Sequence, residues 1–236
     1  MYQYQQTING KEYAFDKNGA MITGWGQDKY GEWYYAKSSG ELYGGWVRVK
    51  GVWYYLDPDD YFMYIGSWNI DGKIYFFSSS GAWVKSPKDG WNSATSTYNN
   101  SDGSSYKYTE WAYYKNGKAL TGWVRVKGTW YYMNKEHGNM VTGVINDNGK
   151  LYFAESNGAL RTKAGWVQET YSDGGKGDWY YLNSDGTCVT GWLELKGKTY
   201  YLDPDAGHMY ADGIYTIDDV DYEFDASGAC LGEADA

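Results

Sequence analysis

Long apolar runs are absent from this chain of 236 residues, and no segment approaches the roughly 20 apolar residues that a membrane-spanning helix needs. The N-terminus, MYQYQQTING, also lacks the basic stretch followed by an apolar stretch that marks a secretory signal peptide. The sequence therefore predicts no membrane insertion. We interpret the opening Met1 as the start of a segment taken from a longer protein.

Basic residues are also few. The chain has 21 Lys and Arg against 30 Asp and Glu, which gives a net charge of -9, and no basic cluster stands out along it. A protein that binds nucleic acid needs a positively charged patch to neutralise phosphates. The sequence therefore predicts that nucleic acid is not a partner.

Histidine is scarce, and the residues that support common enzyme mechanisms are missing. His137 and His208 lie in polar connections, without a Ser/His/Asp or Cys/His spacing around them. The acidic runs at 57–60 and 203–205 lack the Gly and terminal Glu of an EF-hand loop, so we interpret them as turns. Sequence spacing does not show whether two carboxylates meet for glycoside hydrolysis, but nothing indicates such a pair. We expect no catalytic residue, no metal site and no cofactor.

The chain has two cysteines, Cys188 and Cys230. Each follows a turn at a position where Met21 and Met140 stand in other parts of the chain. This shared position indicates small apolar side chains, so we expect two free, buried thiols. A disulfide between them is disfavoured because they lie two repeats apart and would point in different directions.

Aromatic residues, in contrast, are abundant. They make up 20% of the chain, with 13 Trp and 28 Tyr, while the mean hydropathy is only -0.70. Burial must come mainly from Tyr and Trp rings, which bury about 150–250 Å² each. The 32 glycines against three prolines fit many tight turns that need a positive φ.

Most of the tryptophans recur in one motif, Gly-Trp followed by Trp-Tyr-Tyr. Twelve of the 13 occupy its two Trp positions, and only Trp83 lies outside them, where we expect packing or an extra platform. A chain of this kind is a repeat array, whose function lies in the surface that the repeats create together. The clearest copies are Gly24-Trp25 with Trp33-Tyr34-Tyr35, Gly45-Trp46 with Trp53-Tyr54-Tyr55, Gly122-Trp123 with Trp130-Tyr131-Tyr132, and Gly165-Trp166 with Trp179-Tyr180-Tyr181.

The repeats follow one another at a nearly constant period. Successive starts are 21 to 23 residues apart, except for one step of 32 and one of 26, and a short unit at 8–20 precedes them. The starts are the Trp after Gly or its replacement: Trp25, Trp46, Trp68, Trp91, Trp123, Val144, Trp166, Trp192 and Ile214.

Each repeat has the pattern of a β-hairpin. Residues 46–50 alternate apolar and polar side chains, Gly51 provides a turn, and 53–56 form a second segment rich in aromatic residues. An isolated hairpin is marginal in water, so each must pack on its neighbours.

A second period lies above the first, because every third hairpin is of the same kind. GWVRVKGVWYYLDPD at 45–59 matches GWVRVKGTWYYMNKE at 122–136 and GWLELKGKTYYLDPD at 191–205. The sequence therefore predicts an all-β solenoid of about ten β-hairpins, with roughly three hairpins per superhelical turn. It forms a single repeat module over 1–236, with three-hairpin super-repeats near 23–90, 91–165 and 166–232.

The motif resembles the choline-binding and cell-wall-binding repeats of Gram-positive surface proteins. The same family includes the glucan-binding repeats of glucansucrases and the receptor-binding repeats of large clostridial toxins. The resemblance covers residues 7–232 and implies a superhelix of hairpins with ligand sites between consecutive hairpins. In the choline-binding branch, two aromatic residues of one hairpin and a third from the next form a cage, often with a nearby Met.

Carried over to this chain, the resemblance implies few sites, spaced a full superhelical turn apart. The third equivalent meets Thr199 where the closing Trp is expected. Hairpins with Glu12, Ile74, Leu151 or Asp221 at that position lose an aromatic wall. There, Trp pairs such as Trp46 with Trp53, or Trp123 with Trp130, would form open platforms. The implied cages are Trp25, Trp33 and Trp53 near Met63; Trp91, Trp111 and Trp130 near Met140; and an incomplete one with Trp166 and Trp179.

The expected function is therefore that of a non-catalytic module on a secreted or cell-surface protein of a Gram-positive bacterium. Its ligand would be the choline headgroups of teichoic acid, held by cation–π contacts. The same rings can stack on sugars, and the segment 92–110, which we expect to be a long polar loop, has the composition of a sugar site, so a lectin-like module for α-glucan or another glycan stays an alternative. A structural spacer whose aromatic residues are all internal is the third. Exposed solenoid ends make an end-to-end dimer plausible.

Overall fold

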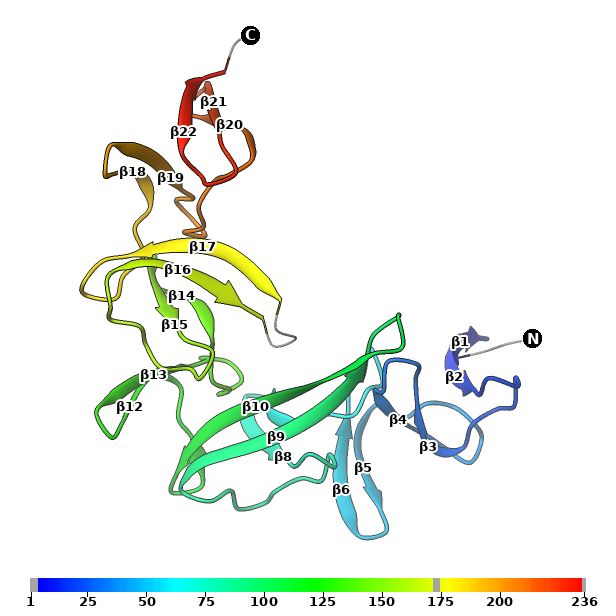
Figure 1. Ribbon diagram of the computed structural model, residues 1–236. Helices are drawn as coiled ribbons and strands as arrows, with labels where there is room; N and C mark the ends of the chain where they lie inside the picture. The colour runs from blue at the N-terminus through cyan, green and yellow to red at the C-terminus, as the bar shows by residue number, and fades with distance from the viewer. Residues whose placement is uncertain (1–3, 172–174, 235–236) are drawn as a thin grey trace. The chain divides into compact units, whose positions relative to one another are not determined.

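The computed structural model describes residues 4–171 and 175–234, which form β-strands, turns and connections without a helix (Figure 1). Within these residues, no helix has the length and apolar character needed to cross a membrane. The strands form ten sheets, each built on one antiparallel hairpin. The prediction of an all-β chain of about ten hairpins is confirmed.

The chain divides into two compact units. The first comprises the residues up to Gly122 together with Met133–Met140, and the second comprises Trp123–Tyr132 and the residues from Val141 onward. The strands of the first unit are β1 (Tyr4–Ile8), β2 (Lys11–Phe15), β3 (Gly24–Gln27), β4 (Trp33–Ala36), β5 (Gly45–Val49), β6 (Val52–Leu56), β7 (Gly66–Ile70), β8 (Lys73–Phe77), β9 (Gly90–Asn99), β10 (Ser105–Lys115) and β11 (Lys118–Ala119).

The second unit holds most of the next hairpin and all of the later ones. Its strands are β12 (Gly122–Val126), β13 (Thr129–Met133), β14 (Gly143–Asp147), β15 (Lys150–Ala154), β16 (Gly165–Thr170), β17 (Lys176–Leu182), β18 (Gly191–Leu195), β19 (Lys198–Leu202), β20 (Gly213–Ile217), β21 (Val220–Phe224) and β22 (Cys230–Glu233). The prediction of one continuous module with three super-repeats stays a prediction.

Tight two-residue turns fix the register of the hairpins. Lys50 and Gly51, between β5 and β6, have φ values of 48° and 87°. Two consecutive positive φ values are the mark of a type I′ turn, whose twist matches that of the flanking strands. The resulting register places Trp46 opposite Tyr55 and Arg48 opposite Trp53.

After most hairpins, the following segment ties that hairpin to the one before it. After β6, the Met63 N–H donates to the Trp33 carbonyl of β4 at 2.7 Å, and the Tyr64 N–H donates to the Tyr55 carbonyl of β6 at 2.9 Å. Met209 and Tyr210 repeat this pattern in the second unit, on Trp179 and Tyr201. The backbone of these connections therefore holds neighbouring hairpins at a fixed spacing.

The apolar cores lie between consecutive hairpins within each unit. In the second unit, Leu182, fully buried, packs with Leu151, Phe153, Val167 and Tyr180. Small clusters of this kind recur, because each hairpin contributes only a few side chains to each neighbour. Both cysteines are free, as predicted; Cys188 is buried, which raises its pKa to about 12, whereas Cys230 is only half-buried.

One repeat start differs from the sequence alignment. The position that Trp46 has in β5, opposite Tyr55, belongs in β7 to Ser67 and not to Trp68, because Ser67 lies opposite Phe76. Ser67 is buried and its hydroxyl donates to the His137 carbonyl at 2.6 Å. Trp68 instead stacks on Tyr64, with ring centroids 4.2 Å apart.

The polar segment 92–110 is not a loop but the outer part of a long hairpin formed by β9 and β10. Its side chains alternate and include many Thr and Tyr, which favour a strand. On β10, the Glu110 carboxylate accepts a hydrogen bond from the Ser67 N–H at 3.3 Å, against β7 of the same unit. Burial raises the pKa of Glu110 to about 7, from an ordinary value of 4.5.

We expect Glu110→Gln to flatten the pH dependence of stability. The pKa of the Glu110 carboxyl is higher in the folded state than in the unfolded state. Its contribution to the free energy of unfolding is therefore fully present below about pH 4.5 and is lost as the pH rises through about 7. The loss amounts to about 2 kcal/mol in the wild type. Urea unfolding at pH 5 and pH 8, with the exposed Glu223→Gln as control, measures it; a pH slope that Glu110→Gln leaves unchanged would contradict the assignment.

The core of the second unit gives a further prediction. Leu182→Ala leaves a cavity among aromatic and aliphatic neighbours and should lower the free energy of unfolding by about 2–5 kcal/mol. Leu231, which is 62% exposed, serves as the matched control, and Leu231→Ala should change it by about 0.5 kcal/mol or less. Equal effects of the two substitutions in chemical denaturation would refute this placement of the core.

Candidate functional site

An aromatic pocket lies in the second unit, between the hairpins β16–β17 and β18–β19. Trp166 of β16 and Trp179 of β17 form two walls, and Tyr200 of β19 forms a third. Trp166 and Tyr200 meet edge to face, with ring centroids 5.0 Å apart and planes at 66°. Met209 completes the lining of a cavity of about 470 Å³. A volume of this size is typical of small-molecule sites.

The backbone places each of these side chains. Tyr181 lies opposite Trp166 in the hairpin and packs edge-on against it at 5.1 Å, which fixes one side of the Trp166 ring. The Met209 N–H donates to the Trp179 carbonyl at 2.8 Å, so the thioether is held beside the second wall. The rings are therefore positioned by the repeat itself.

The pocket is open to solvent and bears no positive charge of its own. Trp179 is 42% exposed. Asp178 and Ser227 lie at the rim, and none of the described residues that line the cavity is Lys or Arg. An apolar, electron-rich pocket with one carboxylate nearby is suited to a cation or to the apolar face of a sugar.

The same arrangement recurs in the other repeats. In the first unit, Trp46, Trp53, Tyr75 and Trp83 line a cavity of about 440 Å³. Trp83 occupies the position of Met209, because its N–H donates to the Trp53 carbonyl at 2.8 Å. The other sets are Trp25, Trp33, Tyr54 and Met63 in the first unit, and Trp123, Trp130, Tyr152 and Leu160 in the second.

The closing wall differs from the sequence expectation. The ring that meets Trp25 is Tyr54, at 4.8 Å, and not Trp53. Successive side chains of a strand point to opposite faces, so Tyr54 faces the preceding hairpin while Trp53 faces the following one beside Trp46. In the same way Tyr200, and not Thr199, closes the pocket of Trp166.

This shift changes which hairpins lose a wall. The sequence comparison assigned the missing wall to Ile74 and Leu151, but their neighbours Tyr75 and Tyr152 supply it, at 5.0 Å from Trp46 and Trp123 respectively. The expected open platforms are therefore closed on this side. In most hairpins a Tyr follows the first position of the second strand, even where that first position is not Trp. This recurrence is the sequence signal that identifies the closing wall.

The remaining predicted residues are divided between two repeats. Trp91 and Trp111 meet at 6.2 Å in the first unit, where the Met140 N–H donates to the Trp111 carbonyl at 2.6 Å. Trp130 pairs with Trp123 at 6.5 Å in the second unit. Their role in binding stays a prediction, as it does for every predicted site residue.

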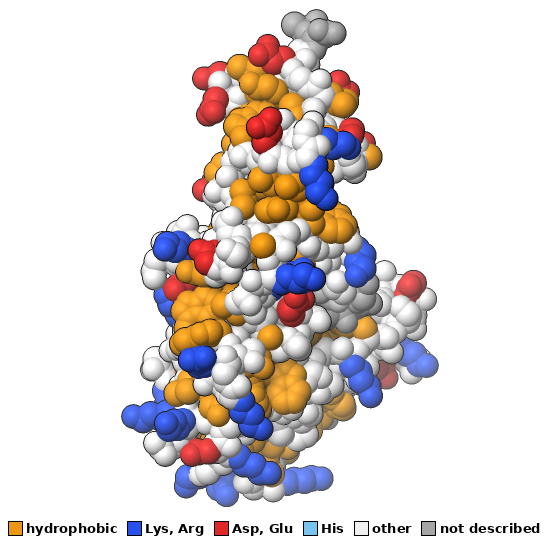
Figure 2. Space-filling view, turned by 60° about the vertical axis from the view of Figure 1, so that its left-hand side comes forward, with side chains coloured by type: hydrophobic (Ala, Val, Ile, Leu, Met, Phe, Trp, Pro, Cys, Tyr) orange, Lys and Arg blue, Asp and Glu red, His pale blue; other side chains and the backbone are white. Residues whose placement is uncertain are grey.

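Exposure of the second Trp is common to these sets. Trp33, Trp53, Trp111, Trp130 and Trp179 are between 39% and 43% exposed. Figure 2 shows that hydrophobic side chains reach the surface at several places on one face, between charged ones. Rings that served only as core would be covered, so these faces are available to a ligand.

Arginine distinguishes two kinds of pocket. The Arg48 guanidinium lies over the Trp53 ring at 5.9 Å, and that of Arg125 lies over Trp130 at 5.7 Å. At the corresponding position opposite Trp33 and Trp179 stand Gln27 and Gln168. Two sets of rings thus carry a built-in cation, and two others have a neutral amide there.

Within residues 4–171 and 175–234, no group of His, Cys, Asp and Glu is arranged to hold a metal ion.

Comparisons with known proteins agree with this geometry. Residues 175–214 match the choline-binding repeat, and residues 23–42, 44–59 and 121–140 match the putative cell wall binding repeat. The first match contains Trp179, Tyr200 and Met209.

Similar curated proteins are streptococcal. Glucosyltransferase-S of Streptococcus mutans serotype c is 29% identical over 182 residues, which is 75% of this chain and 11% of that protein. Glucosyltransferase-I of Streptococcus downei is 28% identical over 233 residues, which is 90% of this chain and 14% of that protein. The chain thus spans only a small part of these relatives.

Among solved structures, CbpJ from Streptococcus pneumoniae TIGR4 is similar, with 24% identity, a TM-score of 0.40, and coverage of 98% of this chain and 88% of that one. Each matched segment contains residues of the aromatic pockets described above, such as Trp33, Trp53, Trp130 and Trp179. Four segments of this chain thus match the choline-binding repeat or the putative cell wall binding repeat.

Proposed function

We propose that this chain is a non-catalytic binding module that holds a bacterial wall polymer through choline headgroups in its aromatic pockets. The observation that carries the proposal is the pocket of Trp166, Trp179, Tyr200 and Met209, with Asp178 at its rim. The parent protein is secreted or attached to the surface of a Gram-positive bacterium. Catalysis is no part of this proposal.

The chemistry of choline suits these walls. A trimethylammonium group has no N–H with which to donate a hydrogen bond, so electron-rich ring faces are its best partners, at about 0.5–2 kcal/mol per contact. Trp166, Trp179 and Tyr200 offer three such rings around one cavity. The Asp178 carboxylate adds attraction for the cation.

The pockets without an arginine are the better choline sites. Arg48 and Arg125 already lie over the exposed rings of Trp53 and Trp130, and they repel a second cation. The pockets of Trp33 and Trp179 have glutamines in the corresponding position. We therefore assign choline to the latter kind.

Retention on a wall polymer follows from repetition of weak sites. Three cation–π walls provide a few kcal/mol, which corresponds to roughly millimolar affinity at each site. A polymer with many headgroups engages several sites at once, so its effective affinity exceeds that of one site.

Glucan is the second candidate ligand. The two streptococcal proteins described above are glucosyltransferases, and their matches cover 75% and 90% of this chain. Indole faces also stack on sugars, and the pockets with Arg48 or Arg125 suit a neutral ligand better than a cation. A glucan module would bind α-glucan oligosaccharides without competition by choline at those pockets.

A choline titration tests the assignment of the closing wall. Tyr200→Ala should weaken choline binding in the second unit by about tenfold or more, because one of three cation–π contacts and the enclosure are lost. Thr199→Ala, its neighbour on the opposite strand face, should leave binding unchanged. Calorimetry with choline measures both; equal losses, or none, would contradict the site.

The two kinds of pocket give a further prediction. Trp179→Ala should remove choline binding at its pocket, whereas Trp53→Ala should leave the choline stoichiometry unchanged because Arg48 already lies over that ring. Calorimetry with choline and, separately, with maltotriose and isomaltotriose follows both variants. A wild-type chain that binds no choline would refute the proposal, and binding of the saccharides alone would favour the glucan module. Binding of none of these ligands would favour a structural spacer.

A further inference from the structure

The hairpin β9–β10 extends well beyond the common repeat. Its strands have ten and eleven residues, whereas β5 and β6 have five each. Residues beyond the pair Trp111 and Ser93 form an arm that continues to the pair Ser105 and Asn99. Tyr98 and Tyr106 stack across this arm, with centroids 5.6 Å apart.

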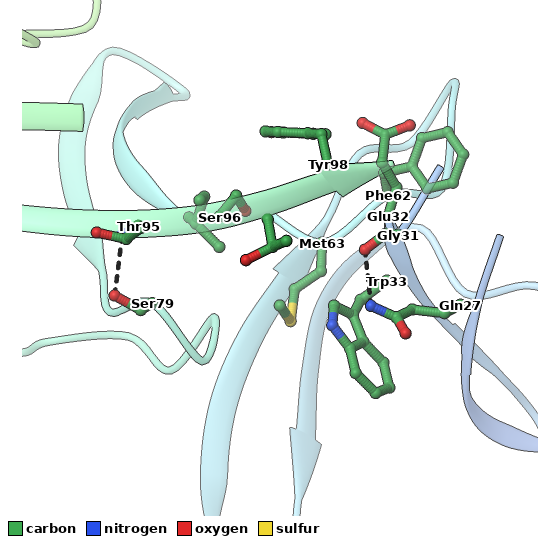
Figure 3. A pocket seen from close by; sticks show the side chains of 12 residues that line it. Gln27, Gly31, Glu32, Trp33, Phe62, Met63, Ser79, Thr95, Ser96 and Tyr98 are labelled. Carbon is green, nitrogen blue, oxygen red and sulfur yellow. Dashed lines mark hydrogen bonds between the residues drawn. The ribbon is translucent and has the colours of Figure 1, made fainter. Parts of the chain in front are cut away.

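The arm is fastened at two points to other parts of the first unit. Near its tip, the Asn99 N–H donates to the Tyr30 carbonyl at 2.8 Å. Further back, the Thr95 N–H donates to the Ser79 hydroxyl oxygen at 2.9 Å (Figure 3). Gly31 packs so closely on the Thr97 carbonyl that an added Cβ would lie 2.9 Å from it. These contacts hold the arm over the loops of two earlier hairpins.

A cavity of about 260 Å³ lies between the two fastening points. Its lining combines hydroxyl, amide and carboxylate groups with the apolar or aromatic side chains of Trp33, Phe62, Met63, Ile65 and Tyr98 (Figure 3). The Gln27 amide is held in place by its hydrogen bond to the Gly31 carbonyl at 2.8 Å. The side chains of Gln27, Glu32, Ser96 and Thr97 provide polar groups in this lining, beside Trp33 and Met63.

This lining differs from that of the aromatic pockets. Only Trp33 and Met63 belong to one of those pockets, and Gln27, Glu32, Ser96 and Thr97 add polar groups that the aromatic pockets lack. None of the described residues in the lining is Lys or Arg, so the cavity is not built for an anion. Burial, together with Asp28 and Asp60, raises the pKa of Glu32, which shows that its carboxylate is held near other negative charge.

Several hydrogen-bonding groups around one exposed indole are the arrangement that a sugar ring requires. Its hydroxyls can donate to carboxylate and carbonyl oxygens and accept from hydroxyl and amide groups, while its C–H face packs on the indole. The volume lies just below the range of small-molecule pockets, so it accommodates a single unit and not a long segment.

We propose that the cavity between the arm and the loops at Gln27–Trp33 and Ser79 binds one neutral sugar unit of a polysaccharide. The arm is an addition to the repeat, so its side of this cavity, with Ser96 and Thr97, has no counterpart in the pockets between repeats. The proposal does not rest on choline as the ligand of the aromatic pockets. Because Trp33 and Met63 line both spaces, one polymer can occupy the two sites together.

Saccharide titrations of the full chain test the site. Glucose, N-acetylglucosamine, maltotriose and isomaltotriose serve as probes, observed by saturation-transfer NMR and calorimetry. Glu32→Ala and Ser96→Ala should each weaken the saccharide that binds by about three- to tenfold, since each removes hydrogen-bonding groups. Ser93→Ala on the same strand and Glu194→Ala in the other unit are the matched controls and should have no effect.

A shortened hairpin gives the stricter test. Ser96 and Tyr108 lie directly opposite each other, so an Asn-Gly turn can join them in place of residues 97–107. This variant should lose saccharide binding at the cavity and keep choline binding at Trp179 in the other unit, which also shows that it is folded. A wild type that binds none of the four saccharides would overturn the proposal, as would undiminished binding by the shortened variant. Loss of choline binding alone would count against the function proposed above and not against this site.

Discussion

The structure depends on the edge-to-face contact between a Trp of one hairpin and a Tyr of the next. It recurs at 4.8–5.0 Å in five places, with Trp25, Trp46, Trp123, Trp166 and Trp192 each meeting a Tyr from the middle of the following second strand. Aromatic pairs prefer this geometry to a face-to-face stack. A hairpin of five-residue strands cannot be stable alone, so the contact supplies much of what the short strands lack.

The same contact explains why core and binding surface are made from one kind of residue. Each of these five Trp residues contacts two Tyr rings, one from its own hairpin and one from the next. The second Trp lies at the edge of that cluster and keeps about two-fifths of its surface exposed. The same hairpin backbone thus presents an exposed indole face in successive repeats. The residue opposite that indole, an arginine in some repeats and a glutamine in others, sets the local charge without changing the backbone.

The arm formed by β9 and β10 shows how a repeat can gain a new surface without losing its frame. The pair Trp91 and Trp111 keeps the standard hairpin geometry at the base, and the extra residue pairs continue outward from there. Hydrogen bonds from Thr95 and Asn99 fasten the extension to loops of two earlier hairpins. The cavity beneath it arises from this insertion and not from the repeat.

The sequence by itself determined the all-β class, the number of hairpins and their turns, because a 21-to-23-residue period, glycine turns and alternating aromatic residues act locally. Only the tertiary structure decided that Tyr54 and Tyr200 close the pockets instead of Trp53 and Thr199, that Ser67 replaces Trp68 in the repeat position, and that residues 92–110 form an arm over a cavity. Each of these depends on which strand face meets the neighbouring hairpin, and a shift of one residue reverses that face.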